Sequence, residues 1–266
     1  GIFVRRGAMM NNLTANVIGG SGQHGIHIAE ISSHDNIIRA NKIGTDVTGE
    51  IAKPNQGSGI FLENVLNTQI EAGLDGPNIM SGNIGHGIEI IDGGAFDDRV
   101  PVIRDAIIGL TASGTALANG GSGVRIFGGT NSRPTNVTIG PNNTISANAR
   151  YGIELVGGSF PHLVQSNNQV IGSFIGTDPT GVLDRGNALG GVLIDNMRAN
   201  TIGGNSKSDQ NIISGNDGPG VEIRGAGSQL NTVQGSRIGV ASDVVLGEAL
   251  TNLGSGILIR DNATDN

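Results

Sequence analysis

The stretch NTIGGNSKSDQNIISGNDGPGVEI, residues 200–223, decides the fold. It contains three short apolar runs, each flanked by Asn or Gly, and its apolar residues show no helical spacing. Short apolar runs between turn-forming residues predict short strands. The chain therefore starts a new strand after only a few residues, and the wider sequence must show how these strands associate.

A glycine followed by an apolar-x-apolar triplet recurs along the chain. Side chains two apart in a strand share a face, so both apolar residues of each triplet point to one side. The glycines are separated by 34, 28, 36, 29, 39, 29 and 36 residues, so short and long intervals alternate and a pair of about 65 residues is the unit. The glycines are Gly25, Gly59, Gly87, Gly123, Gly152, Gly191, Gly220 and Gly256.

Each interval holds two further strand signals. In the long intervals they lie five residues apart, as at Ile38 and Ile43 or at Ile103 and Ile108. The short intervals carry a small insertion between the second and third strands, and the long ones carry a larger insertion before the next triplet, as in TDVTGEIAKPNQGSG at 45–59. Three strands per interval with a fixed phase predict coils that stack, each strand pairing in parallel with its counterpart about 4.8 Å away.

We therefore expect an all-β protein, a right-handed single-stranded parallel β-helix of about eight coils with three strands each, forming one domain over residues 1–266. Its core should be thin and built from Ile, Val and Leu, since the chain has only six Phe, one Tyr and no Trp. Asparagines recur at the corners, Asn83, Asn148 and Asn216 at one and Asn36, Asn168 and Asn231 at another. Stacked amides of this kind hydrogen-bond into ladders, and we interpret them as structural.

Composition excludes several classes of function. The net charge of −7 and the lack of basic runs argue against nucleic acid and anionic membranes as partners. No stretch is long and apolar enough to span a bilayer. The chain has no Cys, which excludes disulfides, thiolate metal sites and cysteine nucleophiles.

The phrases NTIGGN, NIISGN, GVEI and IGTDPTG resemble the repeats of right-handed parallel β-helices of the pectate-lyase-like superfamily. They are most similar to repeats of large secreted or cell-surface bacterial proteins. The resemblance covers nearly the whole chain. It implies the fold but not the function, because such coils occur in enzymes, phage spikes and adhesins.

The enzyme reading finds little support in the motifs. The polygalacturonase pattern of that superfamily implies Asn-Thr-Asp, Asp-Asp, Gly-His-Gly and Arg-Ile-Lys in order, whereas here GHG at 85–87 precedes DD at 97–98 and the other two are missing. His86 is interpreted as a substituted turn position, because Gly-x-Gly precedes many triplets. The densest charged cluster is Asp97, Asp98, Arg99 and Arg104, interpreted as a solvated loop with a catalytic role as the alternative.

Calcium is the one cofactor that the sequence suggests. Asp46 and Asp178 occupy equivalent places in GTDVTGE and GTDPTGV, where each could join Thr and carbonyl oxygens around Ca²⁺. One carboxylate per loop is few for such a site, so local turn hydrogen bonds are the competing interpretation. The long loops should align into a ridge along one edge.

The chain begins and stops within the repeat, so we expect a segment of a longer repeat protein, able to self-associate through the helix ends. The favoured function is a non-catalytic extracellular or cell-surface structural module, adhesive or fibre-forming. The alternatives are a polysaccharide-acting enzyme (lyase, hydrolase or epimerase) and a phage-spike or glycan-binding module.

Overall fold

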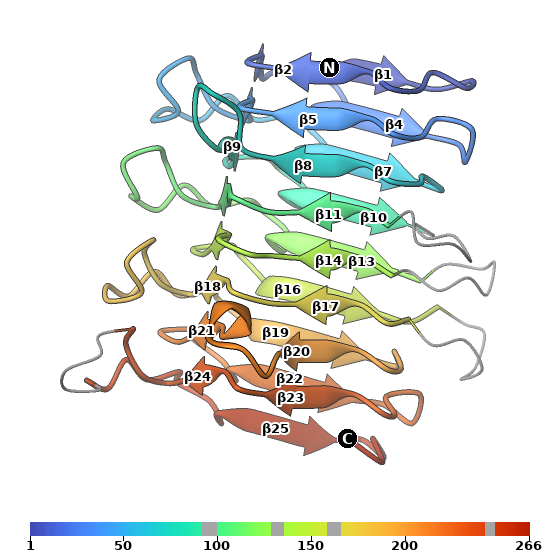
Figure 1. The fold of residues 1–266 in the computed structure, drawn as a ribbon. Helices are drawn as coiled ribbons and strands as arrows, with labels where there is room; N and C mark the ends of the chain where they lie inside the picture. Colours follow the sequence, from blue (N-terminus) through green and yellow to red (C-terminus); the bar gives the residue numbers. More distant parts are fainter. Residues whose placement is uncertain (92–99, 129–135, 159–165, 243–247) are drawn as a thin grey trace.

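The computed structural model describes residues 1–91, 100–128, 136–158, 166–242 and 248–266. Within these residues the strands form three parallel sheets of nine, eight and eight strands, which we call A, B and C. The chain visits them in the order A, B, C and then returns to A one level along the stack (Figure 1). The fold is the expected parallel β-helix.

Sheet A contains the predicted triplets and one additional strand at the start of the chain. Its strands are β1 (Ile2–Val4), β4 (Ile26–Ala29), β7 (Ile60–Glu63), β10 (Ile88–Ile91), β13 (Val124–Phe127), β16 (Tyr151–Val156), β19 (Gly190–Asp195), β22 (Val221–Arg224) and β25 (Ile257–Arg260). Neighbouring triplets pair in exact register, for example Ile88 with Val124 and Ile90 with Ile126.

Sheets B and C hold the two shorter strands of each coil. Sheet B contains β2 (Asn12–Thr14), β5 (Ile37–Arg39), β8 (Gln69–Glu71), β11 (Val102–Ile103), β14 (Thr138–Ile139), β17 (Gln169–Val170), β20 (Thr201–Gly203) and β23 (Thr232–Gln234). Sheet C contains β3 (Val17–Ile18), β6 (Lys42–Ile43), β9 (Asn78–Met80), β12 (Ala106–Ile108), β15 (Thr144–Ile145), β18 (Phe174–Ile175), β21 (Ile212–Ile213) and β24 (Arg237–Ile238).

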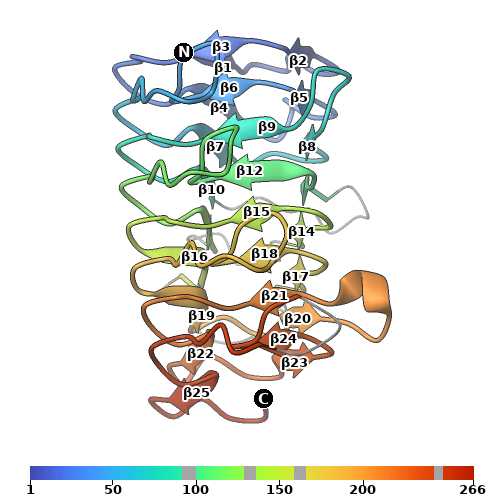
Figure 2. The same ribbon diagram turned by 90° about the vertical axis from the view of Figure 1, so that its left-hand side faces the viewer.

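The coil lengths alternate as predicted, because insertions occur at two corners. The short coils are extended between sheets B and C, at 72–77 and at 204–211, where a short 3₁₀ helix, η1 (Lys207–Asp209), lies. The long coils are extended between sheets C and A. Rungs stacked in this way run the length of the molecule (Figure 2). The right-handed winding stays a prediction, which the general preference for right-handed parallel crossovers supports.

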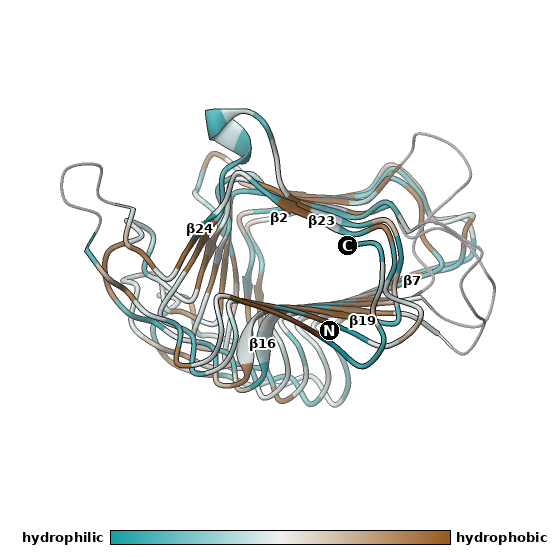
Figure 3. Ribbon diagram, turned by 90° about the horizontal axis from the view of Figure 1, so that it is seen from below, coloured by the Kyte–Doolittle hydropathy of each residue, from teal (hydrophilic) through white to brown (hydrophobic). Residues whose placement is uncertain are grey.

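The core is a thin column of aliphatic side chains, as predicted. The two apolar residues of each triplet from Ile26 to Ile223 are at most 1% exposed, and at least one apolar residue from each sheet B and sheet C strand, such as Ile38 and Ile43, joins them. Seen along the axis, the strands of each sheet superpose around this column (Figure 3). Stacking is what buries it, because one coil has no second layer to cover its apolar face.

Buried asparagine ladders line the corners. At the corner between sheets C and A each side-chain amide donates to the Oδ1 of the next coil's asparagine, at 2.8–3.0 Å. The predicted Asn83, Asn148 and Asn216 are therefore only alternate members. The full ladder is Asn55, Asn83, Asn119, Asn148, Asn187, Asn216 and Asn252.

The second predicted ladder, between sheets A and B, is interrupted. Asn11 donates to Asn36, and a run from Asn168 through Asn200 and Asn231 continues to Asn266. Between these runs the equivalent places hold Thr68, Pro101 and Val137, which have no side-chain amide. A third ladder, not predicted, links Asn16, Asn41 and Asn78 between sheets B and C.

Four long loops form what we call the ledge: 44–59, 109–123, 176–189 and, of the last one, the described residues 239–242 and 248–256. They lie one above another along the left side of Figure 1. Consecutive ledge loops are bonded to each other: Ser113 N–H donates to Glu50 Oε1 at 2.9 Å, Arg185 Nε to Gly114 O at 3.1 Å, and Ser242 N–H to Gly181 O at 2.8 Å. The predicted ridge is therefore a continuous, hydrogen-bonded surface.

Candidate functional site

The outward face of sheet A carries a line of aromatic, acidic, basic and apolar side chains. It is built by the middle residue of each triplet, which points away from the core because its two neighbours point inward. The registered strands place these residues in one line, which we call the outer row. Its members are Phe3, His27, Phe61, Glu89, Arg125, Glu154, Leu193, Glu222 and Leu258.

The centre of the outer row is a chain of ion pairs. Arg125 bonds Glu89 Oε1 at 2.8 Å and lies 3.7 Å from Glu154 Oε2, while Arg150 bonds Glu154 Oε1 at 2.9 Å. The Glu154 side chain is only 3% exposed. Ser58 Oγ donates to the remaining oxygen of Glu89 at 2.9 Å. Glu89 is therefore bonded to donors from both neighbouring coils, and Glu154 is bonded to Arg150 of its own coil, with Arg125 of the preceding coil nearby.

A second cluster surrounds Glu222, whose side chain is 5% exposed. Arg260 bonds its Oε1 at 2.7 Å, and the Tyr151 hydroxyl donates to its Oε2 at 2.9 Å. Burial, together with this hydrogen bond, raises the pKa of Tyr151 to about 12, so the phenol stays protonated near neutral pH. Arg224 pairs with Asp195 at 2.8 Å.

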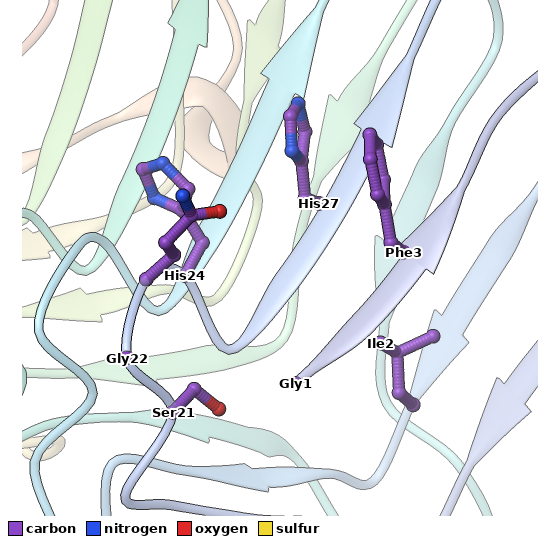
Figure 4. Close-up of a pocket in the computed structure, with 8 residues that line it drawn as sticks. Gly1, Ile2, Phe3, Ser21, Gly22, His24 and His27 are labelled. Carbon is purple, nitrogen blue, oxygen red and sulfur yellow. The ribbon is translucent and has the colours of Figure 1, made fainter.

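The opposite end of the outer row is aromatic. The Phe3 and His27 rings stack with their centroids 4.3 Å apart, and His24 stacks on Phe61 at 4.4 Å. Figure 4 shows the Phe3 and His27 rings face to face beside a hollow lined by Gly1, Ser21 and His24. The Arg5 guanidinium lies 4.7 Å from the Phe3 ring centroid. Ring faces that a sugar would need for stacking are thus engaged by neighbouring side chains.

His24 and His86 occupy equivalent places, each directly before a sheet A glycine. His24 Nδ1 accepts the Ser58 N–H at 3.0 Å, and His86 Nδ1 accepts the Ser122 N–H at 2.9 Å. Burial lowers the pKa of both rings, and for His24 the nearby His27 lowers it further. His86 does stand at the turn position that the sequence indicated, and its ring makes a specific bond between coils.

The most buried ionisable groups of the outer row and its neighbours are engaged in hydrogen bonds and ion pairs. General acid–base catalysis needs a group poised near the working pH with a free path to the reacting atom. Here Glu154 and Glu222 are clamped by arginines, Tyr151 holds its proton, and His86 Nδ1 is occupied by a backbone N–H. What the arrangement does provide is coil-to-coil bonding on the outside of the sheet.

The two predicted calcium residues cap their own turns. Asp46 Oδ1 accepts the backbone N–H groups of Glu50 and Ile51 at 3.1 and 3.2 Å, and the Thr48 hydroxyl at 2.7 Å. The hydrogen bond from Thr48, with those from the backbone, lowers the pKa of the Asp46 carboxyl despite some burial.

Asp178 makes the same turn two long coils further on. Its Oδ1 accepts Val182 N–H and Leu183 N–H, both at 2.9 Å. Burial disfavours its charge, but the hydrogen bonds from Thr180, Leu183 and Val182 outweigh burial and lower its pKa. In the intervening long coil, Thr111 Oγ1 takes this role by accepting Thr115 N–H at 3.0 Å. Turn hydrogen bonding thus accounts for these residues, and calcium binding stays a prediction.

The predicted charged cluster is described only in part. Asp97, Asp98 and Arg99 lie outside the described residues. Arg104 directly follows β11 of sheet B, and it and Arg39 clamp the Glu71 carboxylate from the two neighbouring coils. Burial opposes the charge of Glu71, but the two arginines outweigh it and lower the pKa of that carboxyl. Nowhere in the described part of the chain do three His, Asp or Glu side chains converge on a metal position.

Sequence reasoning missed the outer row, although a signal for it exists. The apolar residues of the triplets identify the repeat, and the middle position, which varies from Phe to Glu to Arg, carries the surface chemistry. Reading that position down the eight triplets as a column lists the outer row from His27 to Leu258.

Comparison with known proteins adds no relatives: no family model and no curated protein sequence matches the chain. The helix that the described structure contains is far too short and polar to cross a bilayer.

Proposed function

We propose that this chain is a non-catalytic structural and adhesive module of an extracellular or cell-surface protein, related to the pectate-lyase-like β-helices. The observation that carries the proposal is the state of the outer row, whose most buried carboxylates are both engaged. Glu222 is bonded to Arg260 and Tyr151 from other coils, and Glu154 is bonded to Arg150 of its own coil with Arg125 of the preceding coil nearby. A glycoside hydrolase acting on this face through these carboxylates would need one of them free.

Two further features fit a rod that keeps its shape. The ladder from Asn55 to Asn252 spans the stack without a gap, and the ledge loops are bonded to one another. Adhesion would use such an extended, fixed surface, since a pre-ordered surface loses little conformational entropy when a partner binds.

The proposal is tested by incubating the protein with a panel of uronate polymers and neutral polysaccharides. Unsaturated products and new reducing ends should stay at the level of a no-protein control, while some insoluble polymers should retain the protein. Product formation that disappears in Glu154→Gln would overturn the proposal in favour of a polysaccharide lyase or hydrolase. Retention by none of the polymers would remove the glycan-adhesive part.

Calcium and self-association are proposed with it as separate properties. If Asp46 and Asp178 bind calcium, millimolar calcium will raise the melting temperature of the wild type but not of a variant with both changed to Asn. If helix ends associate, the sedimentation coefficient will rise with protein concentration. An unchanged melting temperature or sedimentation coefficient removes the respective property.

A further inference from the structure

The first two ledge loops are fastened to sheet A by the same local device. At the end of each loop a glycine lies against a side chain of the preceding coil, the residue directly before that coil's sheet A glycine. The two pairs are Gly57 with His24 and Gly121 with His86. In the other two loops Gly254 meets the Pro219 backbone, and Gly190, one position later in its loop, lies near Tyr151.

The contacts are too close for any side chain at the glycine. A methyl group on Gly57 would lie 2.7 Å from His24 Nδ1, and one on Gly121 would lie 2.6 Å from His86 Nδ1. On Gly190 it would lie 3.1 Å from Tyr151 Cε1. The rings therefore lie directly on the backbone of the returning loop.

In the first two pairs the ring also accepts the next N–H of the loop. His24 Nδ1 takes Ser58 N–H at 3.0 Å and His86 Nδ1 takes Ser122 N–H at 2.9 Å. A ring nitrogen can accept only when it carries no proton, so these bonds require the neutral tautomer with its proton on Nε2. In the third long coil the pinning residue, Tyr151, stays protonated up to a pKa of about 12, and in the fourth Pro219 has no ionisable group.

The geometry points to an acid-sensitive latch: protonation of His24 and His86 removes the acceptors that hold Ser58 and Ser122, and releases the first two ledge loops while the last two stay fastened. Release would expose Ser58 N–H and Ser122 N–H to solvent, since a protonated Nδ1 repels rather than accepts a donor. The ledge would then change shape at one end only.

The charged groups around the two rings set how readily they protonate. His24 faces His27, which opposes a second charge, and Glu63 and Glu89, which favour one. His86 faces Glu89 and Glu154, which favour its protonation, and Arg125 and Arg150, which oppose it. Burial is the largest influence on each ring and favours the neutral, latched state.

The chain supplies its own control one coil after Ser122, at the residue that likewise stands directly before a sheet A glycine. There Tyr151 N–H is held by Ser122 Oγ, at 3.2 Å, and this hydroxyl acceptor does not titrate. The three amides of Ser58, Ser122 and Tyr151 thus occupy the same structural position, and only two of them are held by an imidazole.

The latch is tested by residue-resolved amide hydrogen exchange of the whole chain at about pH 7.5 and about pH 5, corrected for the intrinsic pH dependence of exchange. At the lower pH we expect the exchange protection of the Ser58 and Ser122 amides to fall roughly fivefold or more, which corresponds to the loss of one hydrogen bond. The protection of the Tyr151 amide should be unchanged. An equal fall at all three amides, or no fall, would overturn the proposal.

The matched variant is His86→Asn, whose side-chain oxygen can accept near the Nδ1 position without titrating. It should keep Ser122 protected at both pH values and leave the fall at Ser58 intact. A pH-dependent Ser122 in this variant would contradict the latch. If the variant does not fold, the imidazole nitrogen resonances of the wild type show directly when each ring becomes doubly protonated. A doubly protonated His24 or His86 whose partner amide, Ser58 or Ser122, stays protected would also contradict the latch.

Discussion

Gly123 illustrates how the packing of stacked coils restricts which amino acid fits at a single position. A methyl group placed on it would lie 2.4 Å from Ile145 Cγ2, 2.7 Å from the Gly152 carbonyl oxygen and 2.8 Å from Asn148 Nδ2. The repeated glycine before each triplet is thus required because the next coil leaves no room for a Cβ, and not for a special backbone angle.

Gly123→Ala should therefore lower the free energy of unfolding by about 3 kcal/mol, the upper range for forcing a methyl group into a packed interior. Gly256→Ala is the matched control, because its nearest neighbour would be Ile238 Cγ2 at 3.6 Å. It should change stability by less than about 0.5 kcal/mol. Urea titration of both variants checks this, and equal losses would contradict the packing explanation.

Ser33 tests the cost of a buried hydroxyl. It is fully buried, and its Oγ finds no hydrogen-bond partner among the described residues. Ser33→Ala should raise the free energy of unfolding by about 1 kcal/mol, because an unpaired polar group leaves the core.

Ser228, the equivalent serine six coils further along, supplies the comparison, because its hydroxyl is hydrogen-bonded. It also stands three residues before a corner asparagine, and its Oγ donates to Arg224 O at 2.6 Å. Ser228→Ala should lower stability by about 1 kcal/mol. Thermal melting of the two alanine variants checks both expectations. Stability changes of the same sign would refute this interpretation.

At the scale of the element, three of the four ledge loops are each stabilised by one polar side chain at the first turn. Asp46 and Asp178 do this with a carboxylate, and Thr111 does it with a hydroxyl. The sequence interpretation of local turn chemistry holds for all three loops, including the one that has no Asp.

Asp178→Ala should lower the free energy of unfolding by about 1–2 kcal/mol, since Val182 N–H and Leu183 N–H lose their acceptor. Asp178→Thr should lose about half as much, because Thr111 shows that a hydroxyl serves in this turn. Thermal melting of the two variants decides, and a threonine variant as unstable as the alanine one would exclude the shared role.

Strands and their order followed from the sequence because stacking repeats the same constraint at every coil. The spacing of Ile38 and Ile43 predicts strands of sheets B and C, and the triplets predict the strands of sheet A. The outer row did not follow, since the partners of Glu154 come from Arg125 one coil away and Arg150 four residues away, and only the three-dimensional register shows them together. The same holds for Thr68 and Pro101: a ladder gap is visible only once the coils are aligned.

At the scale of the whole molecule, acid should weaken the fold through its histidines. Burial, the largest cause for each, lowers the pKa of His24, His27 and His86 in the folded protein below the usual 6.5. A lowered folded pKa means that the unfolded chain binds protons more readily. Stability is therefore complete above about pH 6.5 and falls as the pH drops below it, until the folded rings titrate as well.

Chemical denaturation at a series of pH values checks this expectation. The free energy of unfolding should decline between about pH 7 and pH 5, and the decline should be smaller in the variant with His24 and His86 both changed to Asn. A flat profile over this range, or a rise toward acid, would show that the buried rings do not control the response.

The central claim is that the carboxylates of the outer row hold coils together and perform no chemistry, and urea unfolding of Glu154→Gln tests it most directly. If the carboxylate is structural, its neutralisation leaves Arg150 without its ion-pair partner and takes a nearby charge from Arg125, which keeps Glu89. The free energy of unfolding should then fall by about 1–3 kcal/mol. Catalytic groups are commonly held at a cost to stability, and their removal tends to stabilise a protein. An unchanged or increased free energy of unfolding would contradict the account.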